Sequence, residues 1–442
     1  MNGLLSSSIK AILPRKGNFT ANVMTLAGGS TLSHLILIAA SPILTRLYSP
    51  ADFGLWALFI SLTNIMGGIA AWRYEFAIML AQEDGDAANI LGLCLLILAL
   101  MCGLFYSMVA LFGRTIAHLL KSPEISIWLW LAPLTILLTG LFNSLNYWST
   151  RKKKFQSVAV SKVSASMGIA GTQISAGAIH SPVPGGLIAG QVLGQAVGTG
   201  ILARQVWKAD GRAICAALST TGIIDQARRH HKFPLLFMWS TLANNLARQV
   251  PVWFIALSFG TQDTGFFSLA YRTIFLPITL IAQAVSQVFY QRATELKNLT
   301  GDSYSFAKRL TLSLILIPAI PFIALMLWGP ELFALVFGGN WVTAGRYAAI
   351  LCPLAWASFV VGPLTMINAV YEYQEMHLFW QLGLLSIASI VFYATIQYQM
   401  PLEQILYYYS SIVVLWYLVN LFILLRISQG EPLFYRRRRT KA

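Results

Sequence analysis

The chain has 442 residues, of which 57% are hydrophobic and only 11% charged, and its mean hydropathy is +0.65. Soluble proteins carry about 25% charged residues, so the composition excludes an ordinary soluble domain and indicates an all-α polytopic membrane protein. The net charge of +15 does not indicate nucleic-acid binding, because the Lys and Arg residues lie in short segments between apolar stretches and in the tail 436–439.

Twelve stretches approach the roughly 20 residues that a helix needs to cross a bilayer. In chain order the predicted spans are 22–44, 54–78, 89–112, 126–148, 156–179, 185–203, 234–258, 264–289, 306–327, 344–369, 376–397 and 403–426. Residues 1–18 lack the long apolar core of a cleavable signal peptide. The first span is therefore expected to anchor the chain.

Charge predicts the orientation of these spans. With both termini cytoplasmic, 24 Lys and Arg residues fall in cytoplasmic segments, and only Arg46, Arg114, Lys121 and Arg346 fall in outer loops. Such an imbalance is what the positive-inside rule requires. We therefore expect a multi-pass membrane protein with cytoplasmic N- and C-termini.

Two related halves are predicted. The segment 49–58 before the second span resembles 260–269 before the eighth, 211 positions later, and Leu131-Ala-Pro133-Leu134 resembles Leu351-Cys-Pro353-Leu354. We expect an N-terminal lobe (1–210, spans one to six), a cytoplasmic inter-lobe linker (211–232) and a C-terminal lobe (233–442, spans seven to twelve, with a basic tail). Parallel repeats of six helices are typical of alternating-access transporters.

Cations inside apolar spans are the strongest functional signal. Arg248 and Arg272 should lie deep in spans seven and eight, and Lys162 nearer the cytoplasmic end of span five. Each costs about 3 kcal/mol at the bilayer centre unless it faces water or a partner, and no acidic residue lies mid-span to pair with it. Two interpretations stay open: a cavity for an anionic substrate, or hydrogen bonds to carbonyls freed at Pro251 and Pro277.

Further polar residues accompany these cations. Asn244 lies four residues before Arg248, on the same helical face. It is a candidate contact for sugar hydroxyls, or for hydrogen bonds between helices. His34, midway along span one, is a candidate for proton coupling or a neutral interhelical hydrogen bond. Arg73 and Glu75 are candidates for a gate ion pair, which needs a helix end there because residues two apart on a helix do not share a face.

Other signals point to packing or are missing. Glycines at 186, 190, 194 and 198 form a stripe at which another helix can approach closely. The four cysteines fit no metal or disulfide spacing, and no phosphate loop, dinucleotide fingerprint or metal-ligand cluster occurs. We expect no cofactor, with energy from an H⁺ or Na⁺ gradient or the membrane potential.

Several motifs resemble the Wzx-type polysaccharide flippases of the multidrug/oligosaccharidyl-lipid/polysaccharide exporter superfamily. They are Leu44-Thr-Arg46-Leu-Tyr-Ser-Pro50-Ala-Asp52-Phe-Gly54, Arg73-Tyr-Glu75-Phe-Ala-Ile-Met79, Phe233-Pro234, Gly265-Phe-Phe-Ser-Leu-Ala270-Tyr-Arg272 and Phe337-Gly338-Gly-Asn-Trp341-Val-Thr-Ala344. The resemblance implies twelve helices in two lobes and a non-enzymatic flippase of the bacterial inner (plasma) membrane. Its cargo would be an undecaprenyl-pyrophosphate-linked oligosaccharide of O-antigen or lipopolysaccharide type, with polysaccharide polymerase machinery as an expected partner.

Under this hypothesis Arg248 and Arg272 bind the pyrophosphate, because a guanidinium matches phosphate in fork geometry. Lys162, Asn244 and Arg73 complete the substrate-binding set, and Glu75 and His34 serve the gate or coupling. Two rivals remain. A multidrug or organic-cation antiporter needs mid-span Asp or Glu, and a membrane polymerase or glycosyltransferase needs catalytic acids in a large outer loop.

Overall fold

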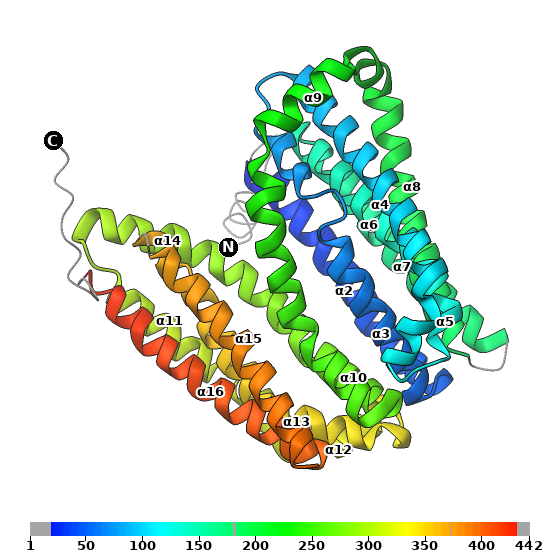
Figure 1. Ribbon diagram of the computed structural model, residues 1–442. Coiled ribbons are helices and arrows are strands. Elements are labelled where there is room, and N and C mark those ends of the chain that lie inside the picture. The colour runs from blue at the N-terminus through cyan, green and yellow to red at the C-terminus, as the bar shows by residue number, and fades with distance from the viewer. Residues whose placement is uncertain (1–18, 180–182, 372, 431–442) are drawn as a thin grey trace, which may run out of the picture. The chain divides into compact units, whose positions relative to one another are not determined.

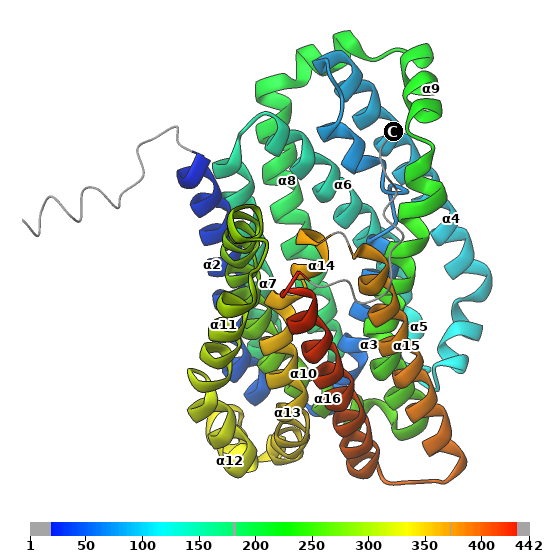
Figure 2. The same ribbon diagram turned by 90° about the vertical axis from the view of Figure 1, so that its left-hand side faces the viewer.

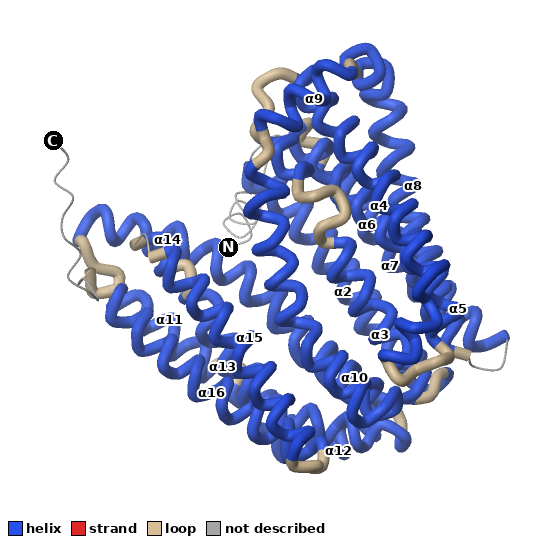
Figure 3. Tube along the Cα trace, viewed as in Figure 1, coloured by secondary structure: helices blue, strands red, loops and turns tan. Residues whose placement is uncertain are grey.

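The computed structural model describes residues 19–179, 183–371 and 373–430; the basic segments before and after them lie outside these ranges. The described chain is helical, with no strand (Figures 1 and 3). In chain order its elements are α2 (Phe19–Leu47), α3 (Pro50–Gly67), η1 (Tyr74–Met79), α4 (Asp84–Leu119), α5 (Ile125–Trp128), η2 (Leu129–Leu131), α6 (Ala132–Arg151), α7 (Phe155–Ile179), α8 (Pro184–Ala217), α9 (Thr220–Arg229), η3 (Phe233–Phe237), α10 (Met238–Thr300), α11 (Tyr304–Leu316), α12 (Ala319–Phe337), η4 (Gly339–Trp341), α13 (Val342–Leu364), α14 (Ile367–Val370), α15 (Gln374–Gln397) and α16 (Leu402–Ile427).

Each of the twelve predicted spans overlaps a helix, which confirms the all-α polytopic class. By length and composition, eight described helical segments could cross a membrane: Gly28–Leu47, Asp84–Leu119, Ile125–Arg151, Pro184–Ala217, Arg248–Leu299, Tyr304–Phe337, Gly339–Val370 and Leu402–Ile427. Arg248–Leu299 has 52 residues, about 78 Å of helix at 1.5 Å per residue. That is more than twice the hydrocarbon thickness, and a non-helical Gly260 (φ 87°) breaks it where the sequence predicts a loop between two spans.

The predicted second span, 54–78, is wrong at its end. Helix α3 stops at Gly67, and the chain continues through turns into the short 3₁₀ helix η1. Trp72 and Arg73 adopt left-handed backbone conformations, with φ of 51° and 64°. Residues other than glycine adopt such angles at a cost, which surrounding contacts must offset. The helix therefore ends six residues before Arg73 rather than beyond it.

Clustering of internal contacts divides the chain into two compact units: Met1–Tyr48 with Leu58–Leu246, and Ser49–Ala57 with Ala247–Ala442. The first half of α3 thus belongs with the C-terminal helices, and the division of the remaining chain falls inside α10. The three-part division 1–210, 211–232 and 233–442 stays a prediction. Within the proposed linker, α8 continues to Ala217 and is followed by α9.

In the first unit, α8 packs along α7, and α7 along α2 (Figure 2). The glycine stripe explains this packing. A Cβ on Gly194 would overlap the backbone of Ile169 on α7, and one on Gly190 would overlap Gln173. The amide of buried Gln173 donates to the carbonyl of Leu187 over 2.9 Å. The stripe is therefore a helix-packing surface, as the sequence predicts.

In the second unit, α13 packs against α11, α12 and α16, and α15 packs against α16. Its core at one end contains Phe289, Leu364 and Leu424, each at most 1% exposed. By contrast, Ile317, just after α11, and Ile320, in the first turn of α12, are 79% and 80% exposed. Large apolar side chains on an outer surface are expected where the surrounding solvent is lipid.

Candidate functional site

Arg272 lies in the second unit, on the part of α10 that follows Gly260. Its guanidinium carbon is 4.9 Å from the ring centroid of Trp56, and Trp56 is only 7% exposed. A guanidinium over an indole face gains about 0.5–2 kcal/mol. Of the two interpretations open from the sequence, a carbonyl at a proline break is not what holds Arg272, because its contact among the described residues is this aromatic ring.

The ring leaves the hydrogen-bonding capacity of Arg272 unused. A guanidinium has five N–H donors, and the described residues form no ion pair or hydrogen bond with them. The side chain is half-buried, in a segment that is long and apolar enough to span a membrane. An anionic ligand that reached Arg272 would find its donors free and its orientation set by Trp56.

Arg248 precedes Gly260 on α10 and is exposed. It lies close enough to the phenols of Tyr271 on α10 and Tyr417 on α16 to interact electrostatically with both. Tyr409, also on α16, interacts with the same two phenols. Phenol groups from two helices, Tyr271 and Tyr417, therefore lie near Arg248 and do not neutralise its charge.

Tyr271 is the middle member of an aromatic row on α10. Its ring stacks on Phe275, with centroids 4.2 Å apart and planes 19° apart, and meets Phe267 at 5.7 Å. Tyr271 is 37% exposed. The second unit therefore contains two guanidinium groups, Arg272 beside the Trp56 ring and Arg248 near phenol groups. That they form one binding site stays a prediction.

The first unit contains the remaining candidates. Lys162 on α7 donates to the hydroxyl of Ser30 on α2 over 3.0 Å. His34 is half-buried on α2, and Asn244 is exposed near the start of α10. The predicted substrate-binding set is thus divided between two units: Arg248 and Arg272 in one, and Lys162, Asn244 and Arg73 in the other. That they line one chamber stays a prediction.

The Arg73–Glu75 ion pair is formed. Nη1 of Arg73 lies 3.3 Å from Oε1 of Glu75, whose side chain is 4% exposed, and the guanidinium carbon lies 4.4 Å from the Phe76 ring centroid. Residues two apart can meet here because the α-helix has already ended and Arg73 has a left-handed backbone. The sequence analysis required a helix end at this position for the two side chains to meet, and the structure has one. The role of the pair as a gate stays a prediction.

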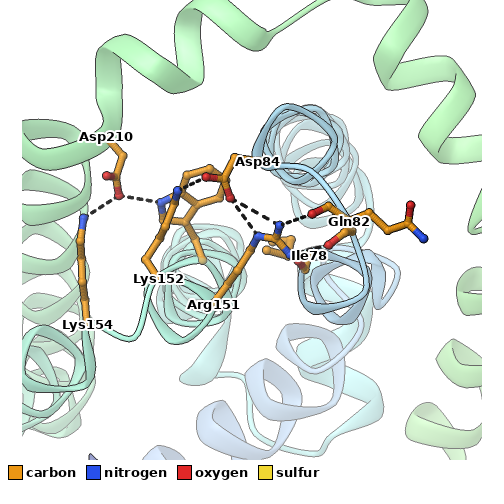
Figure 4. A network of polar contacts seen from close by, with 9 residues as sticks. Ile78, Gln82, Asp84, Arg151, Lys152, Lys154 and Asp210 are labelled. Atoms are coloured by element: carbon orange, nitrogen blue, oxygen red, sulfur yellow. Dashed lines mark hydrogen bonds and ion pairs between the residues drawn. The ribbon is translucent and has the colours of Figure 1, made fainter. Parts of the chain in front are cut away.

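The sequence missed a polar network at one end of the first unit (Figure 4). From the sequence, the basic residues 151–154 count only among the cytoplasmic charges that predict the orientation of the spans. Asp84 at the start of α4 pairs with Lys152 and, at 3.4 Å, with Arg151. Arg151 also donates to the carbonyl of Ala81 over 2.6 Å. These basic side chains therefore tie the end of α6 to the start of α4.

A second carboxylate extends this network to α8 (Figure 4). Asp210 accepts from Lys154 over 2.7 Å and from Nε1 of Trp148 over 3.0 Å. Because Asp210 lies 56 residues from Lys154 in the sequence, spacing alone could not pair them. The network packs three helix ends together and leaves little charge on this cluster.

Asp210→Asn is expected to lower the stability of the chain modestly. It removes one carboxylate from a partly exposed ion pair, which is worth about 1 kcal/mol or less, and weakens the bond from Trp148. Thermal unfolding of the purified chain in detergent should show a midpoint lower by a few degrees. Asp225→Asn, at an exposed position on α9, is the matched control, and an equal shift there would contradict the role given to Asp210.

Among the described residues, no group of three or more His, Cys, Asp or Glu side chains could hold a metal ion. The buried carboxylate Glu75 has Arg73 as its charged partner. The candidate site is thus cationic and aromatic, and its donors are side-chain N–H and O–H groups. Such donors match phosphate oxygens and sugar hydroxyls.

A family model described as a polysaccharide biosynthesis protein matches residues 43–345. Among solved structures, the chain is similar to lipid II flippase MurJ in an inward closed conformation, with 12% identity, a TM-score of 0.69, and 91% of this chain and 89% of that one covered. It is also similar to an inward-facing multidrug resistance MATE family transporter of the MOP superfamily (14% identity, TM-score 0.56, 91% and 94% covered). A third is a MOP superfamily transporter from Pyrococcus furiosus (17% identity, TM-score 0.57, 93% and 97% covered).

No curated protein matches the chain significantly. At these identities the similar structures establish the fold alone, which is that of the MurJ and MATE proteins. Together, the family match and the fold confirm the resemblance that the sequence motifs indicate. The expected architecture, a MATE-like polytopic helical protein, is confirmed with it.

Proposed function

Since this chain belongs to the polysaccharide biosynthesis protein family, we propose that it is a flippase for a lipid-linked glycan. Its cargo would be an oligosaccharide on undecaprenyl pyrophosphate, moved from the inner to the outer leaflet of the bacterial inner membrane by alternating access. The single observation that carries the proposal is Arg272, a guanidinium in a membrane span that is oriented by Trp56 and has no carboxylate partner among the described residues.

Placing Arg272 inside a membrane span costs free energy that its contacts must offset. An Arg at the centre of a membrane helix costs about 3 kcal/mol, and a cation–π contact with the ring of Trp56 returns about 2 kcal/mol of it. An anionic ligand would supply the remainder, because hydrogen bonds between charged groups are worth about 1.5–3 kcal/mol each. The cost of placing Arg272 in the span is therefore best explained by a ligand with negative charge.

The surrounding groups favour a phosphorylated sugar over a simple anion. Tyr271 and Tyr417 place phenol groups around Arg248, and the exposed ring of Tyr271 stacks in a row along α10. Phenols and amides can hydrogen-bond sugar hydroxyls, and ring faces can pack on sugar rings. In this proposal the two arginines bind the pyrophosphate, and the tyrosines and Asn244 contact the glycan.

Orientation and coupling belong to the same proposal. The distribution of Lys and Arg favours cytoplasmic termini, which places Arg73 and Glu75 at the cytoplasmic side as an inner gate. Lys162 would add positive charge along the entry path. The membrane potential is worth about 2.3 kcal/mol per charge at 100 mV, so it can drive a dianionic headgroup outward, and His34 is the candidate if protons contribute.

A multidrug exporter is the competing function, because the same fold is shared with a multidrug transporter. That chemistry needs a carboxylate available to an organic cation. Among the described residues, the buried carboxylate Glu75 already pairs with Arg73, and Asp52 accepts from the backbone and hydroxyl of Ser49. The free donors of Arg272 therefore favour an anionic cargo.

The test is the sidedness of lipid-linked glycan in cells that lack the chain. Deletion is expected to leave repeat units facing the cytoplasm, and the wild-type chain should restore outward transfer. Arg248→Ala should restore at most about a tenth of that transfer, since one charged hydrogen bond is worth at least about 1.5 kcal/mol. Arg309→Ala, at an exposed position on α11, is the control and should restore it fully.

Two outcomes would contradict the proposal. Normal sidedness after deletion would remove the flippase function itself. Full restoration by Arg248→Ala, at equal protein levels, would leave the function in place and remove Arg248 from the binding site. Export of an organic cation that depends on this chain would instead support the competing function.

A further inference from the structure

The cytoplasmic basic residues of the first unit fall into two groups with different surroundings. Arg151, Lys152 and Lys154 are paired with carboxylates. Arg204, Lys208 and Arg212 on α8 are exposed, and no described residue forms an ion pair with them. Their positive charge is therefore available to a ligand outside the chain.

These three cations are four residues apart, so they form one stripe along α8. The opposite face of α8 contains Leu202, Val206 and Ile214, all buried. The stripe therefore points away from the helix packing of the unit. No topological requirement explains such a regular arrangement, because the positive-inside rule counts charges and does not place them on one face.

Further toward the start of α8, the same face is apolar. Leu193 and Val197 lie on it and are 54% and 47% exposed. With 34 residues, α8 is about 51 Å long, whereas the hydrocarbon core is about 30 Å thick. If the span starts near Pro184, the core ends after about 20 residues, so the face turns from apolar to cationic where the bilayer ends.

Trp207 marks the same boundary. It lies one turn beyond Arg204, next to the stripe, and is 66% exposed; its ring covers Gly211, where a Cβ would lie 3.0 Å from it. Tryptophan is enriched at membrane–water interfaces because its ring is apolar and its N–H is polar. An exposed Trp at this depth is expected beside lipid headgroups.

We propose that this face of α8 binds an anionic phospholipid of the cytoplasmic leaflet. Arg204, Lys208 and Arg212 contact the phosphate and the charged headgroup, and an acyl chain lies along Leu193 and Val197. The site rests on the orientation given under the proposed function and not on the identity of the cargo. Its ligand is a bilayer component, separate from the glycolipid that Arg248 and Arg272 are proposed to bind.

Binding of phosphatidylglycerol to the purified full-length chain tests the site. Each cation near an anionic surface contributes about 1 kcal/mol, which corresponds to about fivefold in affinity. The triple variant Arg204→Gln, Lys208→Gln, Arg212→Gln should therefore lose at least tenfold in affinity for phosphatidylglycerol, measured by native mass spectrometry. Affinity for phosphatidylcholine should stay the same, because that headgroup has no net charge.

The control removes three cations from the same side of the protein: Arg228→Gln, Arg229→Gln and Lys232→Gln, at the end of α9 and just beyond it. Burial and the neighbouring Arg229 lower the pKa of His230. Each of the two variants removes three basic side chains. The control should stay within twofold of the unmodified chain. If both variants lost the same affinity for phosphatidylglycerol, the loss would follow from net charge alone, and the proposed site would be overturned.

Cys215 tests the leaflet independently. It is exposed on α8, whereas Cys94 and Cys352 are buried and Cys102 is half-buried. The experiment uses a Cys102→Ser background and a maleimide that cannot cross the membrane. The reagent should label Cys215 only when it has access to the cytoplasmic face. The parent chain and the triple variant should behave alike. Labelling from outside would overturn the proposal, while the sidedness of glycolipid would still test the flippase function separately.

An unchanged affinity for phosphatidylglycerol in the triple variant would also overturn the proposal. The three cations of the stripe would then have to bind a different ligand, such as an acidic protein. A tenfold loss confined to the α8 variant, with correct labelling of Cys215, would establish the lipid site.

Discussion

Arg272→Ala is expected to reduce glycolipid translocation by about tenfold to a hundredfold. The guanidinium is the best-oriented donor of the candidate site, because Trp56 fixes it from one side at 4.9 Å. Hydrogen bonds between charged groups contribute about 1.5–3 kcal/mol, and 1.4 kcal/mol is a factor of ten. The measurement is the initial rate of outward transfer of lipid-linked glycan in reconstituted vesicles.

Arg272→Lys separates charge from geometry. An ammonium retains the positive charge but cannot bind phosphate in fork geometry, so an intermediate rate is expected. Trp56→Ala should also lower the rate, because the guanidinium would lose its orientation while its charge stays. Arg309→Ala serves again as the control. Wild-type rates for Arg272→Ala in correctly folded protein would remove Arg272 from the substrate site.

Gly265→Val is expected to prevent accumulation of folded protein. A Cβ on Gly265 would overlap the carbonyl oxygen of Pro50, and a Cβ on Gly54 would overlap the carbonyl oxygen of Thr261. Backbone atoms cannot move aside as a flexible side chain does, so the helices would have to separate. Overpacking of well-packed side chains already costs about 1–3 kcal/mol, and a clash with backbone should cost more.

The two contacts are related by the repeat in the sequence. Pro50 and Gly54 correspond to Thr261 and Gly265 at the offset of 211 positions, so each copy of the motif presents its glycine to the second residue of the other. This reciprocal packing is the arrangement that a twofold relation between repeats produces. Even Gly54→Ala should therefore be strongly destabilising, although alanine is otherwise preferred over glycine in helices.

The matched control is Gly103→Ala on α4, where nothing lies within 4 Å of an added Cβ. It should leave the yield unchanged or raise stability by up to about 1 kcal/mol. The readouts are the monodisperse yield in detergent and the thermal midpoint. If Gly54→Ala and Gly103→Ala behaved alike, the close approach of the two motifs would not be needed for folding.

The sequence predicted part of the candidate site. Arg248, Arg272 and Lys162 were identified because charge is rare in apolar spans, and Arg73 and Glu75 do form an ion pair. Trp56, Tyr409 and Tyr417 were missed, because aromatic residues are common in membrane helices and nothing in their spacing distinguishes a partner of an arginine from a packing residue. The carboxylate partners of Arg151, Lys152 and Lys154 were also missed. The positive-inside rule already explains basic residues in a cytoplasmic loop, so nothing in the sequence indicated that they form ion pairs.

Hydropathy by itself determined that this is a helical membrane protein and where most of its long helices lie. The physical reason is local: in lipid every backbone N–H and C=O must be satisfied within the segment, so an apolar stretch of sufficient length becomes a helix whatever its neighbours are. The end of α3 at Gly67 and the contacts of Gly54, Arg272 and Asp210 were decided only by tertiary structure. Those depend on which helices meet and at what depth, and residues far apart in the chain determine that jointly.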